Sequence, residues 1–227
     1  MAMAKNLDSI EVLRQRTLLD LKWRKLLKLA KWFRYAPFVD FVLGAGSMAI
    51  GNVHPESDFD VIVGVREGRI FSARYGLNLI FSLLRARRLD DFETSSRDKF
   101  CFNHFVTPAT YSKPPHNEYR KRLYANLVPI CGNPEKIKEF FEANEWSEVN
   151  ADNNLSDLRF GYPKMSRFAD FLNRLLGGRA GEILEKKIAE PVARRRLERY
   201  LAKKNSGGRV IVSPEELEFH FTLPYEK

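Results

Sequence analysis

A glycine-rich turn followed by a pair of aspartates constrains this chain more than any other feature. The 227-residue sequence contains FVLGAGSMAIGNVHPESDFDVIV at residues 41–63. Its first half, at residues 44–49, has the Gly-x-Gly-x-x-Ala spacing of a dinucleotide-binding turn. Its second half places Asp58 and Asp60 one residue apart at the start of another apolar run. The glycines suggest a redox cofactor, whereas the aspartates suggest a metal and a nucleotide.

The dinucleotide interpretation requires a long helix after the glycine turn. Only a few residues separate Gly46 from Gly51 and Pro55, whereas a crossover between parallel strands needs about ten or more residues. The acidic residue that binds the ribose is expected about 20 residues further on, at the end of a second strand. Asp58 and Asp60 come earlier and begin a strand. We therefore exclude a dinucleotide fold.

The aspartates fit a divalent metal site. Residues i and i+2 of a strand point to the same side, so the carboxylates of Asp58 and Asp60 repel each other. A divalent cation that also holds a triphosphate relieves this repulsion. A short helix after Gly46 and Ser47 would present backbone N–H groups and a hydroxyl group to an anion. The residues after Asp58 lack the glycine and glutamate of an EF-hand, and the chain has no GK[ST] phosphate loop.

Together these features resemble the nucleotidyltransferase superfamily, which has a polymerase-beta-like fold. Its signature is Gly-Ser after the first strand, a gap of about ten residues and Asp-x-Asp in the second strand. Gly46-Ser47 and Asp58-x-Asp60 match this signature, and the resemblance covers about residues 38–107. It implies that Gly46 and Ser47 bind the nucleotide, and that Asp58 and Asp60 are catalytic and bind Mg²⁺ (or Mn²⁺). The implied reaction moves a nucleoside monophosphate from an NTP to a hydroxyl group on RNA, a protein or a small molecule.

The family also uses a third carboxylate on a later strand, which this chain lacks where we expect it. Aligning the apolar frame of residues 99–107 with that strand puts Asn103 at the position, as a weak metal ligand that cannot act as a general base. His104 is then expected on the opposite face. Asp98 or Glu93 would reach the metals only through a bulge or another register. Two hypotheses stay open, an active enzyme and a catalytically degenerate member that binds a nucleotide or RNA.

Hydrophobic periodicity, together with the family resemblance, predicts an α+β fold built on a small mixed β-sheet. Strands or extended segments are expected at residues 38–43, 59–65, 99–107 and 127–132, and helices at residues 8–35, 69–88 and 134–141. Beyond residue 154 the pattern is mostly helical, with interruptions at Gly177-Gly178 and Pro191. We predict a nucleotidyltransferase-like domain at 1–150, including the N-terminal helix, and a mainly helical C-terminal region at 151–227.

The net charge of +9 is concentrated near both ends of the chain. Residues 1–35 contain nine Lys and Arg against three Asp and Glu, and residues 160–205 contain twelve against five. Such a surface attracts phosphates, either of a nucleotide or of RNA. The alternative is that these charges form solvated faces of helices.

The C-terminal region contains the candidates for acceptor binding. Arg194, Arg195 and Arg199 lie on about one and a half helical turns and could contact acceptor phosphates. Phe168 and Phe171 could stack on a base, but we expect them in the core.

The composition does not suggest a membrane protein. No stretch reaches the roughly 18 uncharged apolar residues of a membrane span, and the N-terminus lacks the apolar core of a signal peptide. Cys101 and Cys131 lie in or beside apolar runs. We therefore predict two buried free thiols and a cytoplasmic protein.

Overall fold

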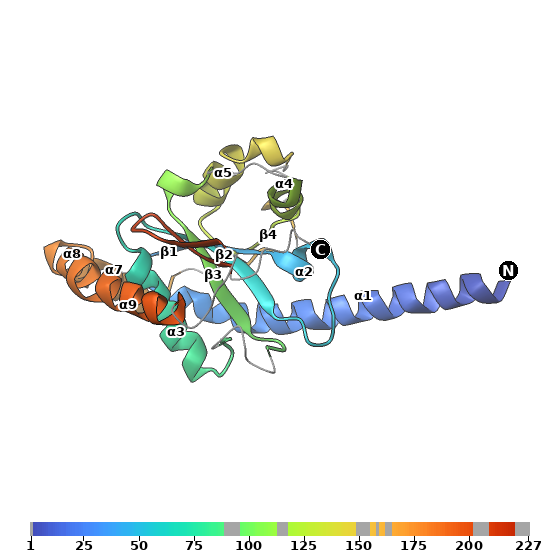
Figure 1. Cartoon of the computed structure of the whole chain (residues 1–227). Helices are drawn as coiled ribbons and strands as arrows, with labels where there is room; N and C mark the ends of the chain where they lie inside the picture. The colour runs from blue at the N-terminus through green and yellow to red at the C-terminus, as the bar shows by residue number, and fades with distance from the viewer. Residues whose placement is uncertain are drawn as a thin grey trace.

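A mixed β-sheet with helices on both faces forms the centre of the molecule (Figure 1). The structure is a computed structural model that describes residues 2–88, 96–112, 118–148, 155–157, 159–161, 165–201 and 209–220. The α+β prediction is confirmed.

Six strands form the sheet in the order β4-β1-β2-β3-β6-β5. Strands β2 and β3 run parallel, and every other neighbouring pair is antiparallel. The strands are β1 (Val39–Gly44), β2 (Phe59–Val65), β3 (Phe100–Val106), β4 (Val128–Gly132), β5 (Arg209–Val212) and β6 (Glu216–His220).

The helices follow the strands in chain order. The α-helices are α1 (Ala2–Ala30), α2 (Gly46–Ile50), α3 (Ile70–Leu83), α4 (Glu118–Ala125), α5 (Pro134–Glu142), α7 (Arg167–Leu175), α8 (Arg179–Leu184) and α9 (Glu190–Leu201). Short 3-10 turns are η1 (Lys31–Tyr35), η2 (Pro108–Thr110) and η3 (Glu145–Ser147), and η4 (Glu185–Ala189) is a π-helical turn.

Alternating side chains of the central strands divide the core into two layers. Phe59, Val61 and Val63 of β2 pack with residues of α1, η1 and α3. Ile62, between them, packs on the other face with residues of α4 and α5. This alternation determines the face of the sheet to which Asp60 points, because a shift of β2 by one residue would turn the Asp60 side chain into the first layer.

Helix α1 packs on the sheet only through its second half. Trp23, Leu26 and Ala30 are buried, whereas the N-terminal half projects away from the body (Figure 1). The helix begins at Ala2, so the predicted start at residue 8 is wrong. The preceding residues AMAKNL contain good helix formers, which extend the helix beyond the capping signal.

The C-terminal segment contacts α3, the start of β1 and the sheet. The buried Glu185 carboxylate accepts hydrogen bonds from the backbone N–H groups of Phe71 (2.7 Å) and Ser72 (3.0 Å), at the first turn of α3. The backbone N–H of Phe38 donates to Asn173 Oδ1 at 2.8 Å. Residues 209–220 form a hairpin whose strand β6 pairs with β3. The segment that we expected to be mainly helical therefore also extends the sheet.

Two local predictions about this region and the thiols can be compared with the structure. The helical pattern is interrupted between α7 and α8 at Gly177 and Gly178, and η4 ends at Ala189, so that Pro191 is the second residue of α9. Both cysteines are free and buried, as predicted, and burial raises the pKa of Cys131 to about 12. Within the described ranges, no helix combines the length and apolar character needed to cross a membrane.

Asp40, the second residue of β1, is held in an unfavourable environment. Burial raises the pKa of its carboxyl group to about 6, although the nearby Arg66 and Lys136 act to lower it. The folded state therefore binds this proton more tightly than the unfolded state does. Protonated Asp40 stabilises the fold fully below the unfolded pKa of about 3.9, and this stabilisation is lost as the pH rises through 6.

We therefore expect Asp40→Asn to raise the free energy of unfolding by about 2 kcal/mol at pH 8 and to change it little at pH 4. The measurement is urea denaturation of both proteins at the two pH values. Asp20→Asn, at an exposed position of α1, is the control and should have a small effect at both. An equal effect of Asp40→Asn at pH 4 and pH 8 would contradict the assignment.

Candidate functional site

The end of β1 and the beginnings of β2 and β3 meet at one edge of the sheet. Strand β1 is antiparallel to β2, so its last residue, Gly44, pairs with Val61 near the start of β2. Strand β3 is parallel to β2 and starts at the same edge. Helix α2 follows β1 after a single residue. The topology therefore brings the glycine turn and the paired aspartates together.

Gly46 lies directly against Asp60. A Cβ atom on Gly46 would lie 2.3 Å from Asp60 Oδ2, and Gly46 has a φ of +58°, which glycine adopts most easily. The backbone N–H of Ala45 donates to the Asp60 carbonyl oxygen at 3.0 Å, which fixes the turn on β2. Ser47 is partly exposed and follows Gly46 in α2. The predicted nucleotide-binding and metal-binding residues thus lie in one place.

Two carboxylates and a thiol converge at this edge. Donor atoms of Asp58, Asp60 and Cys101 all lie within 4.8 Å of one another. Arg88 Nη1 also contacts Asp58 Oδ2 at 2.7 Å, and the Asp58 side chain is 15% exposed. The guanidinium group compensates part of the negative charge here. Two carboxylates and a thiol this close together are donor groups that could bind a cation.

The register of β3 differs from our expectation. Cys101 pairs with Asp60 and His104 pairs with Ile62, so Phe102 and Asn103 of β3 together oppose the single residue Val61 of β2 in a β-bulge. Cys101, and not Asn103, therefore lies beside Asp60, and His104 comes to the same face as Ile62 instead of the opposite face. The apolar pattern could not reveal the extra residue, because Phe102 and Phe105 on either side of the bulge both pack in the same core layer.

The other two acids considered for the third position have different outcomes. Glu93 lies outside the described residues. Asp98 forms ion pairs with Lys22 (3.0 Å) and Lys25 (2.5 Å) of α1. Burial acts to raise the pKa of Asp98, but hydrogen bonds from Lys25 and Lys22 outweigh it and lower the pKa. Asp98 therefore connects α1 to the segment that leads into β3, and it is outside the group formed by Asp58 and Asp60.

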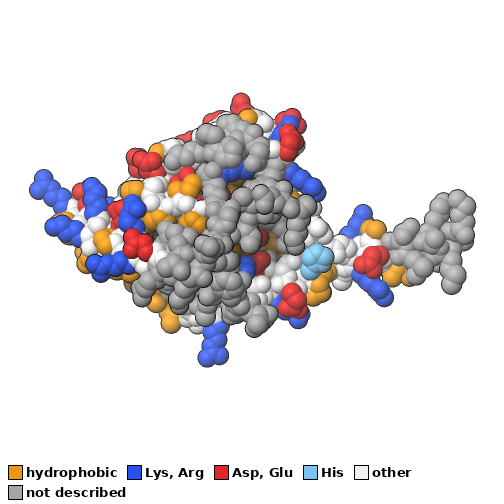
Figure 2. All heavy atoms as spheres, viewed as in Figure 1, with side chains coloured by type: hydrophobic (Ala, Val, Ile, Leu, Met, Phe, Trp, Pro, Cys, Tyr) orange, Lys and Arg blue, Asp and Glu red, His pale blue; other side chains and the backbone are white. Residues whose placement is uncertain are grey.

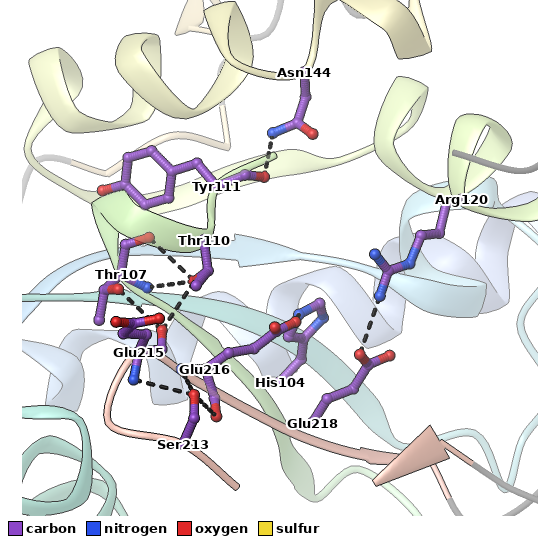
Figure 3. A network of polar contacts seen from close by, with 10 residues as sticks. All are labelled: His104, Thr107, Thr110, Tyr111, Arg120, Asn144, Ser213, Glu215, Glu216 and Glu218. Carbon is purple, nitrogen blue, oxygen red and sulfur yellow. Dashed lines mark hydrogen bonds and ion pairs between the residues drawn. The ribbon is translucent and has the colours of Figure 1, made fainter. Parts of the chain in front are cut away.

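A second polar cluster lies on the same face, further along β3 (Figure 3). Figure 3 shows Arg120 reaching from α4 to Glu218, with Nη2 3.0 Å from Oε2. His104 Nε2 lies 3.8 Å from Glu216 Oε1, and donor atoms of His104, Glu216 and Glu218 are within 4.8 Å of one another.

This second cluster is closed to solvent. The side chains of Arg120, His104, Glu216 and Glu218 are each at most 6% exposed. The Arg120 guanidinium already supplies a cation at hydrogen-bond distance, and such a buried pair fixes how α4 lies on β6. We therefore assign the cluster to the packing of the sheet, and the more open group at Asp58 and Asp60 to function.

The predicted acceptor-binding arginines differ in their environments. Arg194 forms an ion pair with Glu190 one turn away, at 2.7 Å. Arg195 is exposed on α9, and the side chain of Arg199 lies outside the described part of the chain. Phe168 and Phe171 are each 58% exposed, so the expectation that they belong to the core is wrong. Helix α7 packs through Ala169, which leaves these rings on its outer side. Figure 2 shows hydrophobic side chains among Lys and Arg over α7, α8 and α9.

An apolar cavity of about 410 Å³ lies away from the aspartates, between α3 and the C-terminal helices. Its lining includes Tyr75, Leu176, Ile188 and Val192. Apart from the hydroxyl groups of Ser72 and Tyr75, its described lining is apolar and contains no charged side chain, so it does not compete with the sheet edge as the site of the predicted chemistry.

Comparison with known proteins identifies no relative: no family model, no curated protein and no solved structure matches the chain. What the chain does must therefore be inferred from the sequence motif and the geometry of the site.

The contact between Gly46 and Asp60 can be tested against a glycine of similar conformation. Gly68 has a φ of +69°, but a Cβ there would have no neighbour within 4 Å. We expect Gly68→Ala to lower the free energy of unfolding by about 1–2 kcal/mol through backbone strain alone. Gly46→Ala should cost more, because Asp60 must also move. Urea denaturation of both variants measures the difference, and equal losses would show that the close approach is absent.

Proposed function

We propose that this chain is a Mg²⁺-dependent nucleotidyltransferase that moves a nucleoside monophosphate from an NTP to a hydroxyl acceptor. The observation that carries the proposal is the contact of the Gly46 turn with Asp60, beside Asp58. Two carboxylates at the start of β2 and a glycine turn with a neighbouring hydroxyl group are the parts that a metal–triphosphate complex requires. The motif of Gly46-Ser47 and Asp58-x-Asp60 supports the same activity by resemblance.

The donor set fits one Mg²⁺ ion. Mg²⁺ is bound in such sites by one or two carboxylates, and the phosphates and water complete its coordination. Asp58 and Asp60 would hold the ion, which would neutralise charge on the triphosphate and polarise a phosphoryl oxygen. The thiol of Cys101 is a poor ligand for Mg²⁺. Within the described residues, no third carboxylate joins this group.

The remaining residues have roles that follow from their positions. Gly46 has no side chain to obstruct the phosphates, and the Ser47 hydroxyl can donate a hydrogen bond to one of them. Arg88, at 2.7 Å from Asp58, brings positive charge to the same edge and can stabilise charge that develops on the phosphates. In the reaction, the acceptor oxygen forms a bond to the α-phosphorus, pyrophosphate leaves, and the hydroxyl proton passes to solvent or to the released pyrophosphate.

A second candidate function is nucleotide binding without transfer. Cys101 stands beside Asp60, at the place where the family resemblance implies a carboxylate. A protein with this change could still bind Mg·NTP through Asp58 and Asp60. It would be a degenerate member of the family that binds a nucleotide or RNA.

RNA is the acceptor that the surface of the C-terminal helices supports best. Single-stranded nucleic acid is bound by aromatic rings that stack on bases and by basic side chains that contact phosphates. Phe168 and Phe171 of α7 are both 58% exposed, and Arg167 and Arg195 are exposed on α7 and α9.

We expect Asp58→Asn and Asp60→Asn each to abolish Mg²⁺-dependent NTP binding, measured by calorimetry, while the protein stays folded. A carboxylate is needed to balance the charge of the metal, and asparagine has nearly the same shape. Asp20→Asn, the same change at an exposed position of α1, is the matched control. Incubation of the parent with each α-³²P-labelled NTP, Mg²⁺ and total RNA or lysate then separates the two candidates. Label on a macromolecule or on a small molecule of the lysate, resolved by gel and by thin-layer chromatography, indicates transfer, and binding without transferred label indicates the degenerate member. Binding by both variants as tight as the parent's would rule out the site.

RNA binding can be tested separately with the parent and two variants. Phe171→Ala should weaken binding of single-stranded RNA by about 1–3 kcal/mol through loss of stacking. Arg195→Glu should flatten the dependence of log K on log salt by about one unit. Lys138→Glu, an equal charge reversal at an exposed position of α5, is the control. Filter binding that detects no RNA at low salt would favour a small-molecule or protein acceptor instead.

A further inference from the structure

We propose that Cys101 makes this site a three-ligand centre for a thiophilic divalent cation of the Zn²⁺ class, in addition to the Mg²⁺ that accompanies the nucleotide. The proposed function uses only Asp58 and Asp60, so the new inference shares two ligands with it but does not require a nucleotide. It rests on the positions of three donor atoms, from Asp58 just before β2, from Asp60 in β2 and from Cys101 in the adjacent strand β3.

The strand pairing fixes the direction of the thiol. Cys101 pairs with Asp60 in the parallel ladder, and paired residues of neighbouring strands point to the same face. Its neighbours Phe100 and Phe102 are buried in the layer on the other face, at 0% and 7% exposure. The thiol cannot turn away from Asp60 without removing two aromatic rings from the core. Cys101 is therefore held toward the carboxylates by the packing of the strand.

The separations suit a metal ion after small movements. Donor atoms of Asp58, Asp60 and Cys101 lie within 4.8 Å of one another. Ligands of a tetrahedral Zn²⁺ site, with Zn–O of about 2.0–2.2 Å and Zn–S of about 2.3 Å, are separated by about 3.5 Å. Side-chain movements of about an ångström would bring the three donor atoms to the bonding distances of one ion. Three protein ligands leave a fourth position open, as in catalytic zinc sites, and a phosphate oxygen could occupy it.

The chemistry of the donor set determines which ion it selects. A thiolate favours Zn²⁺ and similar soft ions, whereas an all-oxygen set favours Mg²⁺ and Mn²⁺. The partly exposed Asp58 provides access for the ion, although Arg88 must release or share its carboxylate. The mixture of oxygen and sulfur therefore distinguishes this site from one with a third carboxylate.

The first test uses Cd²⁺ as a probe of the thiol in nucleotide-free protein. Addition of Cd²⁺ should produce an ultraviolet cadmium–thiolate absorption band in the parent and in Cys131→Ser. Cys131 is the matched control, because it is the other of the chain's two cysteines and is also buried. Cys101→Ser should lose the band and bind Cd²⁺ at least about tenfold more weakly, and Cys101→Asp should bind Mg²⁺ more tightly than the parent. A band that persists in Cys101→Ser, or no band in the parent, would overturn the proposal.

The second test does not depend on the folding of a Cys101 variant. X-ray absorption at the zinc edge of Zn²⁺-loaded Cys131→Ser should show one sulfur neighbour at about 2.3 Å, and a shell of oxygen and nitrogen alone would overturn the proposal. Mg·NTP calorimetry on the parent distinguishes the two failures. NTP binding without a metal–sulfur signal leaves the proposed function intact, and a metal–sulfur signal without NTP binding leaves only the thiophilic site.

Discussion

Backbone and carboxylate approach each other so closely at the start of α2 that any side chain at Gly46 would displace Asp60. Any Cβ there would lie 2.3 Å from Asp60 Oδ2, which is far inside van der Waals contact. The approach exists because β1 is antiparallel to β2 and passes directly into α2, while the Ala45 N–H is hydrogen-bonded to Asp60. The turn and the aspartates, about a dozen residues apart in the sequence, therefore share one edge of the sheet. The other site residues are positioned relative to this contact.

Buried charged side chains, among them Lys22 and Glu185, stabilise the structure around this edge of the sheet. Lys22 of α1 is 2% exposed and donates to the Ser57 carbonyl oxygen at 2.7 Å, immediately before Asp58. The same ammonium group pairs with Asp98, so it links α1 to the segments that enter both β2 and β3. On the far side, Glu185 caps the first turn of α3. The contacts of α1 thus fix the segments that lead into the parallel strands β2 and β3. They thereby fix the positions of Asp58 and Cys101.

Sequence patterns identified most of this architecture but not its irregular points. The run of residues 59–65 alternates between two apolar layers, so β2 could be predicted to the residue. The bulge in β3 depends on pairing with β2 and not on its own pattern, so Asn103 was placed where Cys101 lies. The β5–β6 hairpin is short and gains stability from β3, which a local pattern cannot show. Phe168 and Phe171 have the spacing of core residues, but no described element covers them.

For the nucleotidyltransferase that we propose, the absence of a third carboxylate from the described site would cost less than it would in other reactions. Transfer of a phosphoryl group passes through a loose transition state, in which positioning and charge stabilisation contribute more than removal of a proton. A carboxylate in the third position has two tasks, to bind a metal and to accept a proton. A thiol beside Asp60 could bind a metal in place of that carboxylate, with a softer ion. Acceptance of the proton is the task that a loose transition state needs least. The geometry around Cys101 is therefore compatible with the transfer that we propose, as long as the cation that the three side chains would hold still polarises the phosphate.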